Sequence, residues 1–363
     1  MRIDAQFLGL DRTGGIVVLF RYLAALRDAG HDVSITSLGT DGDRRFLPAP
    51  ANVPVAYLGL RGPAYRALVR TIPGGLHYPS IELGRLRRAA PPVDLRLATY
   101  SFTVLSAIDA GAPVHHHVQH YEALLEPTER RRRLVDMALN ADVYRTANCT
   151  WVADRIVEAG GDVQGIVPPA IDHEVFTVTG RAAPACEDPT RPLRIMTLGK
   201  AIDWKGLVDV VAGTRSAARH LGPVELHSYG QNPPKVPADL PSVHHGLVDA
   251  PTLAELYRSS DISVTASWYE SFPLPPIEAM ASGTAVICTR LGTEDYAVHE
   301  QNCLIVPARE PDAIAAAVQR LARDGDLRRE LVANGIATAQ RFQWADSERL
   351  FVQHAEHAAG VRV

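Results

Sequence analysis

Cysteine, methionine and tryptophan are scarce in this chain, with four residues of each among 363. The cysteines are scattered and form no CxxC pair; they are Cys149, Cys186, Cys288 and Cys303. Their spacing argues against the usual zinc ligand sets and against a disulfide framework, and it is typical of proteins from a reducing compartment. The sequence therefore predicts a cytoplasmic protein without a metal site.

Long apolar runs and an excess of positive charge are also missing. No window holds the roughly 18 apolar residues that a membrane-spanning helix needs. Asp4 and Gln6 interrupt the stretch where a signal peptide would have its apolar core. The 37 Lys and Arg residues are outnumbered by 41 Asp and Glu residues, for a net charge of −4. With no net attraction for phosphate backbones, nucleic-acid binding is not expected.

The remaining composition is that of an ordinary globular protein, with 46% hydrophobic and 21% charged residues. At about 150 residues per domain, the length predicts two domains. The first opens with a strand at 3–7, the Gly14-Gly15 turn, a helix at 16–29 and a strand at 31–38, which is a βαβ beginning. Further strands are expected at 93–100, 113–119 and 142–148, with helices at 128–140 and after a Thr150 cap.

A second series of strands and helices follows a polar, proline-rich stretch at 177–192. The strands at 193–199, 224–230, 261–267 and 284–289 alternate with helices. Two such series predict an α/β protein of two Rossmann-like domains facing across a cleft. We expect an N-terminal, acceptor-side domain at 1–176, a linker at 177–192, and a nucleotide-sugar-binding domain at 193–340. A C-terminal helical segment at 341–363 is expected to pack back toward the first domain.

Chemistry-bearing residues concentrate in WYESFPLPPIEAMASG, residues 268–283. This loop follows a strand and opens a helix, at the sheet edge where open α/β sheets bind ligands. Glu270 and Glu278 frame the loop, and carboxylates accept hydrogen bonds from the hydroxyl pairs of a sugar or a ribose. Either glutamate alone is equally typical of a helix start, where acidic residues complement the dipole.

This segment resembles the E-x7-E motif of glycosyltransferase family 4, a retaining family with the GT-B fold. The motif covers Glu270-Ser271-Phe272-Pro273-Leu274-Pro275-Pro276-Ile277-Glu278, and Ala279–Val286 continues the pattern. Gly199-Lys200 and Lys205-Gly206 occupy the family's GRxxxxKG positions. Pro168–Asp172 with Phe176, and Gly14-Gly15 with Gly30–Val33, resemble further family segments. Val118-Gln119-His120-Tyr121-Glu122 is similar to a segment of a rhamnosyltransferase-like branch, with His120 in place of its Asp.

The resemblance implies a nucleoside diphosphate sugar as donor, no cofactor and no metal. Lys200 and Lys205 would hold the diphosphate, Glu278 the ribose hydroxyls, and Glu270 hydroxyls of the donor sugar. Ser271, Phe272, Pro273 and Leu274 would line the donor site, with the backbone N–H groups of Phe272 and Leu274 as donors. Gly14 and Gly15 would let the backbone approach the diphosphate, and His120 would contact the donor sugar or the acceptor.

Two of these positions depart from the family pattern. Pro273 stands where the family usually has glycine, so one backbone N–H donor is lost. Lys200 replaces the usual arginine, which keeps the charge but not the bidentate fork. Both changes bear on the choice of donor and leave a phosphate site in place.

Three further features are open to a plainer interpretation. In the strand at 113–119, His115 and His117 point to one side and His116 to the other, which does not suit a metal site. Asp41-Gly42-Asp43 imitates a metal-binding DxD motif but is an ordinary turn sequence. Arg130–Arg133 forms a basic run that fits either a solvated helix face or a peripheral contact with an anionic membrane.

The sequence thus predicts a retaining hexosyltransferase that uses a nucleotide sugar and a small-molecule, glycan or lipid-linked acceptor. A GT-B nucleotide-sugar epimerase, which would consume the donor without an acceptor, is the main alternative. A non-catalytic nucleotide-sugar binder is another. A dinucleotide-dependent oxidoreductase ranks lower because the first turn lacks a full GxGxxG.

Overall fold

The structure is a computed structural model that describes residues 1–10, 14–39, 52–59, 78–108, 110–126, 128–180 and 191–361. The acidic tripeptide at 41–43 and most of the linker expected at 177–192 lie outside the described residues. Contacts between Cα atoms divide the chain into two units. The first unit combines Met1–Pro169 with Ala345–Val363, and the second comprises Ala170–Trp344.

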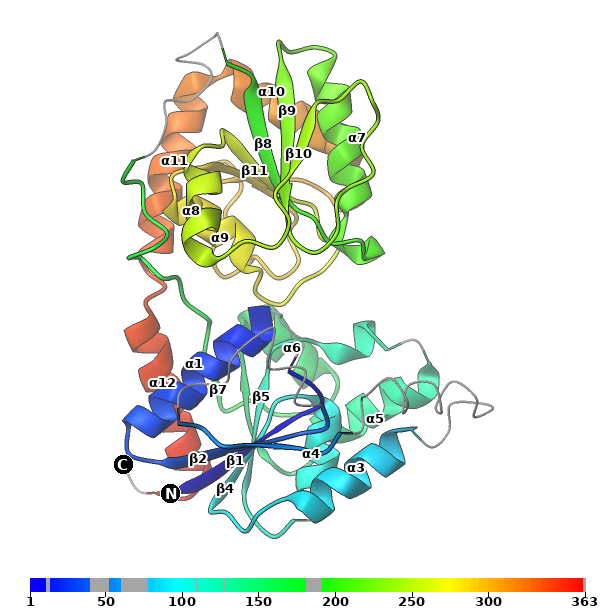
Figure 1. Ribbon diagram of the computed structural model, residues 1–363, viewed down its shortest axis with the longest axis vertical. Coiled ribbons are helices and arrows are strands. Elements are labelled where there is room, and N and C mark those ends of the chain that lie inside the picture. Colours follow the sequence, from blue (N-terminus) through cyan, green and yellow to red (C-terminus); the bar gives the residue numbers. More distant parts are fainter. Residues whose placement is uncertain are drawn as a thin grey trace. The chain divides into compact units, whose positions relative to one another are not determined.

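The first unit is a parallel sheet of seven strands in the order β3-β2-β1-β4-β5-β6-β7 (Figure 1). The strand order reverses between β1 and β4, which makes the sheet doubly wound. Its strands are β1 (Arg2–Phe7), β2 (Asp32–Ser37), β3 (Val55–Tyr57), β4 (Leu95–Ala98), β5 (Val114–Val118), β6 (Tyr144–Ala147) and β7 (Gly165–Ile166). Its helices are α1 (Gly14–Asp28), α3 (Tyr78–Ala89), α4 (Ser101–Ala107), η3 (Glu122–Leu124), α5 (Glu129–Leu139), α6 (Thr150–Glu158) and α12 (Trp344–Ala358).

Helix α12 belongs to this first unit because its apolar side packs on α1 and β5. The Phe351 ring stacks on the Tyr22 ring at 4.2 Å between centroids and 7° between planes. The Tyr22 hydroxyl lies 2.8 Å from the Ser347 hydroxyl. Both aromatic side chains are fully buried, and such burial is worth about 1.5–3 kcal/mol per large apolar side chain. The last helix therefore completes the core of the first unit.

The second unit is a parallel sheet of six strands in the order β10-β9-β8-β11-β12-β13. Its strands are β8 (Leu193–Leu198), β9 (Val224–Tyr229), β10 (Ser242–His244), β11 (Ile262–Thr265), β12 (Ala285–Cys288) and β13 (Leu304–Ile305). Its helices are η4 (Asp203–Lys205), α7 (Leu207–Ala218), α8 (Ala250–Arg258), α9 (Leu274–Ala281), α10 (Pro311–Arg323) and α11 (Gly325–Ala339). Two parallel sheets with helical crossovers confirm the α/β fold expected from the alternating elements.

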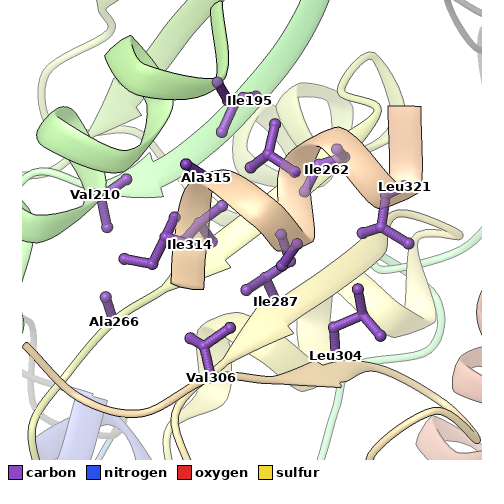
Figure 2. Packing of buried hydrophobic residues seen from close by; sticks show 14 of the residues in the cluster. Ile195, Val210, Ile262, Ala266, Ile287, Leu304, Val306, Ile314, Ala315 and Leu321 are labelled. Carbon is purple, nitrogen blue, oxygen red and sulfur yellow. The ribbon is translucent and has the colours of Figure 1, made fainter. Parts of the chain in front are cut away.

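A buried apolar cluster holds this second sheet to its helices. Figure 2 shows Ile314 and Ala315 of α10 gathered with Ile262 and Ile287 of the central strands. All four side chains are buried. These strands read as near-continuous apolar runs because a parallel sheet is covered on both faces.

Two local expectations are wrong. The α6 cap is Cys149, whose Sγ accepts a hydrogen bond from Val152 N at 3.4 Å, and Thr150 is the first helical residue. The α1 helix begins at Gly14, so the two glycines open the helix instead of forming a turn before it. Both differences shift a helix start by one or two residues, within the usual fraying of helix ends.

The arginine run lies on α5, and Arg131, Arg132 and Arg133 each have a local carboxylate partner. Arg131 pairs with Glu126, and Arg133 pairs with Glu129 at 3.2 Å. Arg132 also lies 3.8 Å from Glu129. These pairs fit the solvated-face interpretation of the run. Within the described part of the chain, no helix combines the length and apolarity that crossing a membrane requires.

Candidate active site

The site residues of the second unit gather at the carboxyl edge of its sheet. Strands β8 and β11 are neighbours, and each is followed by a loop at the same edge because the strands are parallel. Strands β9 and β10 extend the sheet on the β8 side of this pair, and strands β12 and β13 extend it on the β11 side. Such a switch point is where ligands bind in open α/β sheets.

Lys205 and Glu270 form an ion pair across these two loops. The Lys205 Nζ contacts Glu270 Oε1, and the Ser267 hydroxyl donates to the same oxygen at 2.8 Å. The side chains are only 14% and 11% exposed. A cation held in low dielectric by a fixed carboxylate is preorganised for a second anion.

Gly206 explains why the lysine turn can approach the second loop. Its φ of 65° is left-handed, and an added Cβ would lie 2.0 Å from the Ala266 carbonyl oxygen. No side chain fits there. From the other side, Gly292 also approaches Glu270 closely, since a Cβ added there would lie 2.5 Å from the Glu270 carbonyl carbon. The pair is thus built by backbone packing that only glycine permits.

Lys200 follows β8 and is half-buried. Burial lowers the pKa of Lys200, the charge of Lys205 lowers it further, and Glu270 opposes both. Two ammonium groups therefore disfavour each other in this site. An anion bound between them would relieve that repulsion and raise the pKa of Lys200 again.

The α9 helix starts at Leu274, with Pro273 as its cap and prolines at its second and third positions. Prolines have no N–H group, so of the four residues that open a helix only Leu274 offers an unbonded N–H. This start is a poorer backbone donor than a helix N-terminus ordinarily provides.

Ser271 and Phe272 are buried, and the Phe272 ring packs on Tyr296 at 5.1 Å. Because its ring is packed in this way, Phe272 can contact a ligand only through its backbone.

Glu278 is the fifth residue of α9. Burial raises the pKa of its carboxyl group to about 8. Burial also raises the pKa of Tyr229, and the charge of Glu278 adds to this, so the two groups lie near each other. The Tyr229 and Tyr257 hydroxyls are 2.8 Å apart. Glu278 is therefore a half-buried acid with hydroxyl groups nearby.

The other predicted residues belong to the first unit. The Gln119 amide donates to the Gly15 carbonyl at 3.1 Å, which ties the start of α1 to the segment after β5. Asn148, after β6, donates to the Gln119 carbonyl at 3.1 Å. His120 follows β5 directly and is half-buried. The carboxyl edge of this sheet thus brings Gly14, Gly15 and His120 into one neighbourhood.

The three histidines of β5 are core residues. His115 and His117 lie on one side, and each ring is within 3.0 Å of the Thr146 hydroxyl. His116 lies on the other side, near Arg145. Burial lowers the pKa of all three, so they are neutral at physiological pH. Among the residues that the structure describes, no three His, Cys, Asp or Glu side chains are grouped as a metal site.

Sequence reasoning missed the residues that hold the glutamates in place. Ser267 bonds the Glu270 carboxylate, and the Thr289 hydroxyl donates to the Ser267 carbonyl. Tyr229 and Tyr257 lie near enough to Glu278 for its charge to raise the pKa of both hydroxyl groups. One signal was available for Ser267, which ends the strand predicted at 261–267, at the ligand-binding edge of the sheet. Nothing in the sequence points to Thr289, because its partner is 22 residues away.

Comparisons with known proteins agree with this architecture. Residues 192–324 match the model of the family described as glycosyl transferases group 1, and this range contains Lys200, Lys205, Glu270 and Glu278. A D-inositol 3-phosphate glycosyltransferase of Arthrobacter sp. (strain FB24) is 26% identical, over 97% of this chain and 91% of its own length. A D-inositol 3-phosphate glycosyltransferase of Acidothermus cellulolyticus is 34% identical, over 60% of this chain and 54% of its own.

Solved structures share the fold of two Rossmann-like units. Sucrose-phosphate synthase from Thermosynechococcus elongatus matches with a TM-score of 0.79 at 18% identity, covering 100% of both chains. Anabaena Alr3699/HepE, in complex with UDP and glucose, matches with a TM-score of 0.76 at 15% identity, covering 97% of this chain and 98% of that one. These matches confirm the GT-B fold. Residues 192–324 are similar to glycosyl transferases group 1, and the chain is a glycosyltransferase.

Proposed function

We propose that the chain is a family 4 enzyme that moves a hexose from a nucleoside diphosphate sugar to a hydroxyl group of an acceptor, with retention. The observation that carries the proposal is the buried Lys205–Glu270 pair beside Lys200, at the switch point of a sheet in a glycosyl transferases group 1 domain. The complex of Alr3699/HepE with UDP and glucose supports a nucleotide sugar as donor.

In this proposal the two lysines bind the diphosphate. As the bond from the anomeric carbon to the phosphate oxygen breaks, charge grows on the leaving diphosphate, and fixed cations stabilise that charge. The acceptor oxygen bonds to the anomeric carbon on the same face, and its proton passes to the leaving phosphate oxygen. Glu270 binds hydroxyls of the transferred sugar and orients Lys205. Ser271, Phe272, Pro273 and Leu274 line the donor site with it.

The experiment that tests this function supplies a panel of nucleoside diphosphate sugars with and without candidate acceptors. Transfer to an acceptor, with the anomeric configuration of the donor, supports the proposal. Donor conversion to an isomer without acceptor would instead identify an epimerase. Binding without any turnover would identify a nucleotide-sugar binder. The acceptor panel includes small molecules, glycans and lipid-linked sugars, and inositol 3-phosphate is included because the relatives' names suggest it.

The Glu278 carboxyl group makes donor binding pH-dependent. Its pKa is raised to about 8 in the unliganded protein, so at pH 6–7 it must lose a proton before it accepts hydrogen bonds from the ribose hydroxyls as a carboxylate. Nucleoside diphosphate affinity should therefore rise by up to about tenfold per pH unit between pH 6 and 8. Glu278→Gln should remove this slope and weaken binding at pH 8 by about tenfold or more.

Calorimetry across that pH range measures both effects. The stability of the free protein gives an independent control. Because the folded carboxyl group holds its proton up to about pH 8 and the unfolded one loses it near its ordinary value of 4.5, stability falls as pH rises through that window. Glu278→Gln should flatten this decline. Wild-type affinity with a wild-type pH slope in the variant would refute the ribose assignment.

Catalysis is expected to need no divalent metal, because Lys200 and Lys205 supply the positive charge that the diphosphate requires. Dialysis against a chelator followed by assay in metal-free buffer should leave turnover unchanged. Loss of activity that manganese or magnesium restores would contradict this role of the lysines.

His120 is proposed to contact the donor sugar or the acceptor. It follows β5 at the sheet edge where the α1 start is held by Gln119. His120→Ala should lower turnover about tenfold or more, within the range of a lost side-chain contact in the transition state. Nucleoside diphosphate affinity and melting temperature should stay close to wild type. A fall in melting temperature that matches the loss of activity would show a structural role.

A further inference from the structure

Aromatic side chains gather around the Lys205–Glu270 pair. The Trp204 and Tyr269 rings stack at 5.1 Å between centroids and 13° between planes. The Lys205 Nζ lies 4.2 Å from the Trp204 ring centroid. Each ionic partner is therefore preceded in the chain by a ring, and the two rings contact each other. A cation near an aromatic face is held there by the ring quadrupole.

Trp268 connects this pair of rings to three separate segments. Its backbone N–H donates to the Trp204 carbonyl at 2.7 Å. Its indole N–H donates to the Asp209 carboxylate on α7 at 3.1 Å. The Arg309 guanidinium lies 3.8 Å from its ring centroid. The loop after β11 is thus joined to the lysine turn, to α7 and to the residues after β13.

The backbone conformation of Arg309 indicates that its surroundings determine its position. Its φ of 64° is left-handed, which a non-glycine residue adopts only when its surroundings determine it. Trp268 is half-buried and Arg309 is exposed, so neither is part of the apolar core. Their contacts converge on the turn that carries Lys205 and on the loop that carries Glu270.

We propose that the Trp268 side chain is a positioning group that keeps Lys205 and Glu270 in register by bonding Asp209 of α7 and stacking with Arg309, on a loop whose backbone is joined to Trp204. The inference rests on the proposed function, since it assumes that the pair acts on the donor. A displacement of about 1 Å in a reacting group lowers the rate by roughly a hundredfold. We therefore expect displacement of Lys205 to lower turnover by about tenfold to a hundredfold.

The test compares two substitutions of Trp268. Trp268→Leu removes both the indole N–H and the ring that stacks with Arg309. Trp268→Phe removes the N–H and makes the ring smaller but keeps an aromatic face for Arg309, so it should recover part of the turnover. Val208→Ala is the local control, because Val208 adjoins the same turn on α7 and is 79% exposed. We expect turnover at saturating donor to fall at least tenfold in Trp268→Leu, less in Trp268→Phe, and not in Val208→Ala.

A second readout reports on Lys205 without any substrate. The chain has only three lysines, Lys200, Lys205 and Lys235, so labelling lysine Cε with carbon-13 gives three assignable signals. In Trp268→Leu the Lys205 signal should shift or broaden, while that of the exposed Lys235 stays in place. The melting temperature should change by less than about 4 °C.

Three results would overturn the proposal: wild-type turnover in Trp268→Leu, an unmoved Lys205 signal, or a fall in melting temperature that accounts for the lost activity. Failure of the proposed function looks different. In that case the wild-type protein neither binds nucleoside diphosphates nor transfers sugar. The Lys205 signal would still report whether Trp268 positions the lysine.

Discussion

Replacement of Lys205 by alanine is expected to cut turnover at saturating donor by about a hundredfold. The comparison is with the loss of one preorganised donor at an oxyanion, which has an effect of that size. The Lys205 ammonium is fixed by Glu270 and by the Trp204 ring, so little reorganisation is needed when charge develops on the leaving diphosphate. Its interaction is therefore stronger in the transition state than in the ground state.

Steady-state kinetics with donor and acceptor varied separately measures this effect. Lys205→Arg keeps the charge and should recover part of the turnover, whereas Lys235→Ala, at an exposed position, should behave as wild type. A raised Michaelis constant with normal turnover would mean that Lys205 only binds the donor. Wild-type values in both parameters would mean that the diphosphate binds elsewhere.

Gly206→Ala is expected to destabilise the second unit strongly. The added Cβ would lie 2.0 Å from the Ala266 carbonyl oxygen, and the residue would still need a φ of 65°. Left-handed backbone costs about 1–2 kcal/mol in a non-glycine residue, and the clash with a backbone atom adds to it. The total should reach about 3 kcal/mol or more, in the range of severe substitutions.

Calorimetry of this variant should show the unfolding transition of the second unit roughly 6–12 °C lower, at 2–4 °C per kcal/mol. Gly222→Ala is the matched control, because nothing lies within 4 Å of an added Cβ there. If Gly206→Ala melted like wild type, the close approach of the lysine turn to Ala266 would be wrong. The geometry of the Lys205–Glu270 pair would then have to be revised.

The fold was largely predictable because its signals are local. Buried parallel strands appear as short apolar runs, and glycines and prolines separate them from amphipathic helices. Strand ends came out within two or three residues; the strand expected at 93–100, for example, is β4, Leu95–Ala98. Helix starts were less predictable. Cys149 caps α6 where Thr150 was expected, so this helix begins one residue earlier than the Thr150 hydroxyl suggested.

The candidate site was predictable only as a set of residue types. The spacing of Glu270 and Glu278 suggested a ligand-binding loop, but the ion pair of Lys205 with Glu270 joins residues 65 apart. Nothing local signals such a contact. The raised pKa of Glu278 likewise depends on burial beneath other elements. The histidines of β5 show the opposite case. Their dense local pattern resembles a metal-binding sequence, but the side chains are buried and neutral in the core.

The central claim is that Lys200 and Lys205 bind the diphosphate of a nucleotide donor. Titration of the lysine-labelled protein with the diphosphates of adenosine, guanosine, uridine, cytidine and thymidine tests it most directly, since the chain has only three lysines. At least one nucleotide should move the signals of Lys200 and Lys205 together and saturably, and leave Lys235 unmoved. Equal shifts of all three signals, or no shift of Lys200 and Lys205 with any nucleotide, would contradict the account.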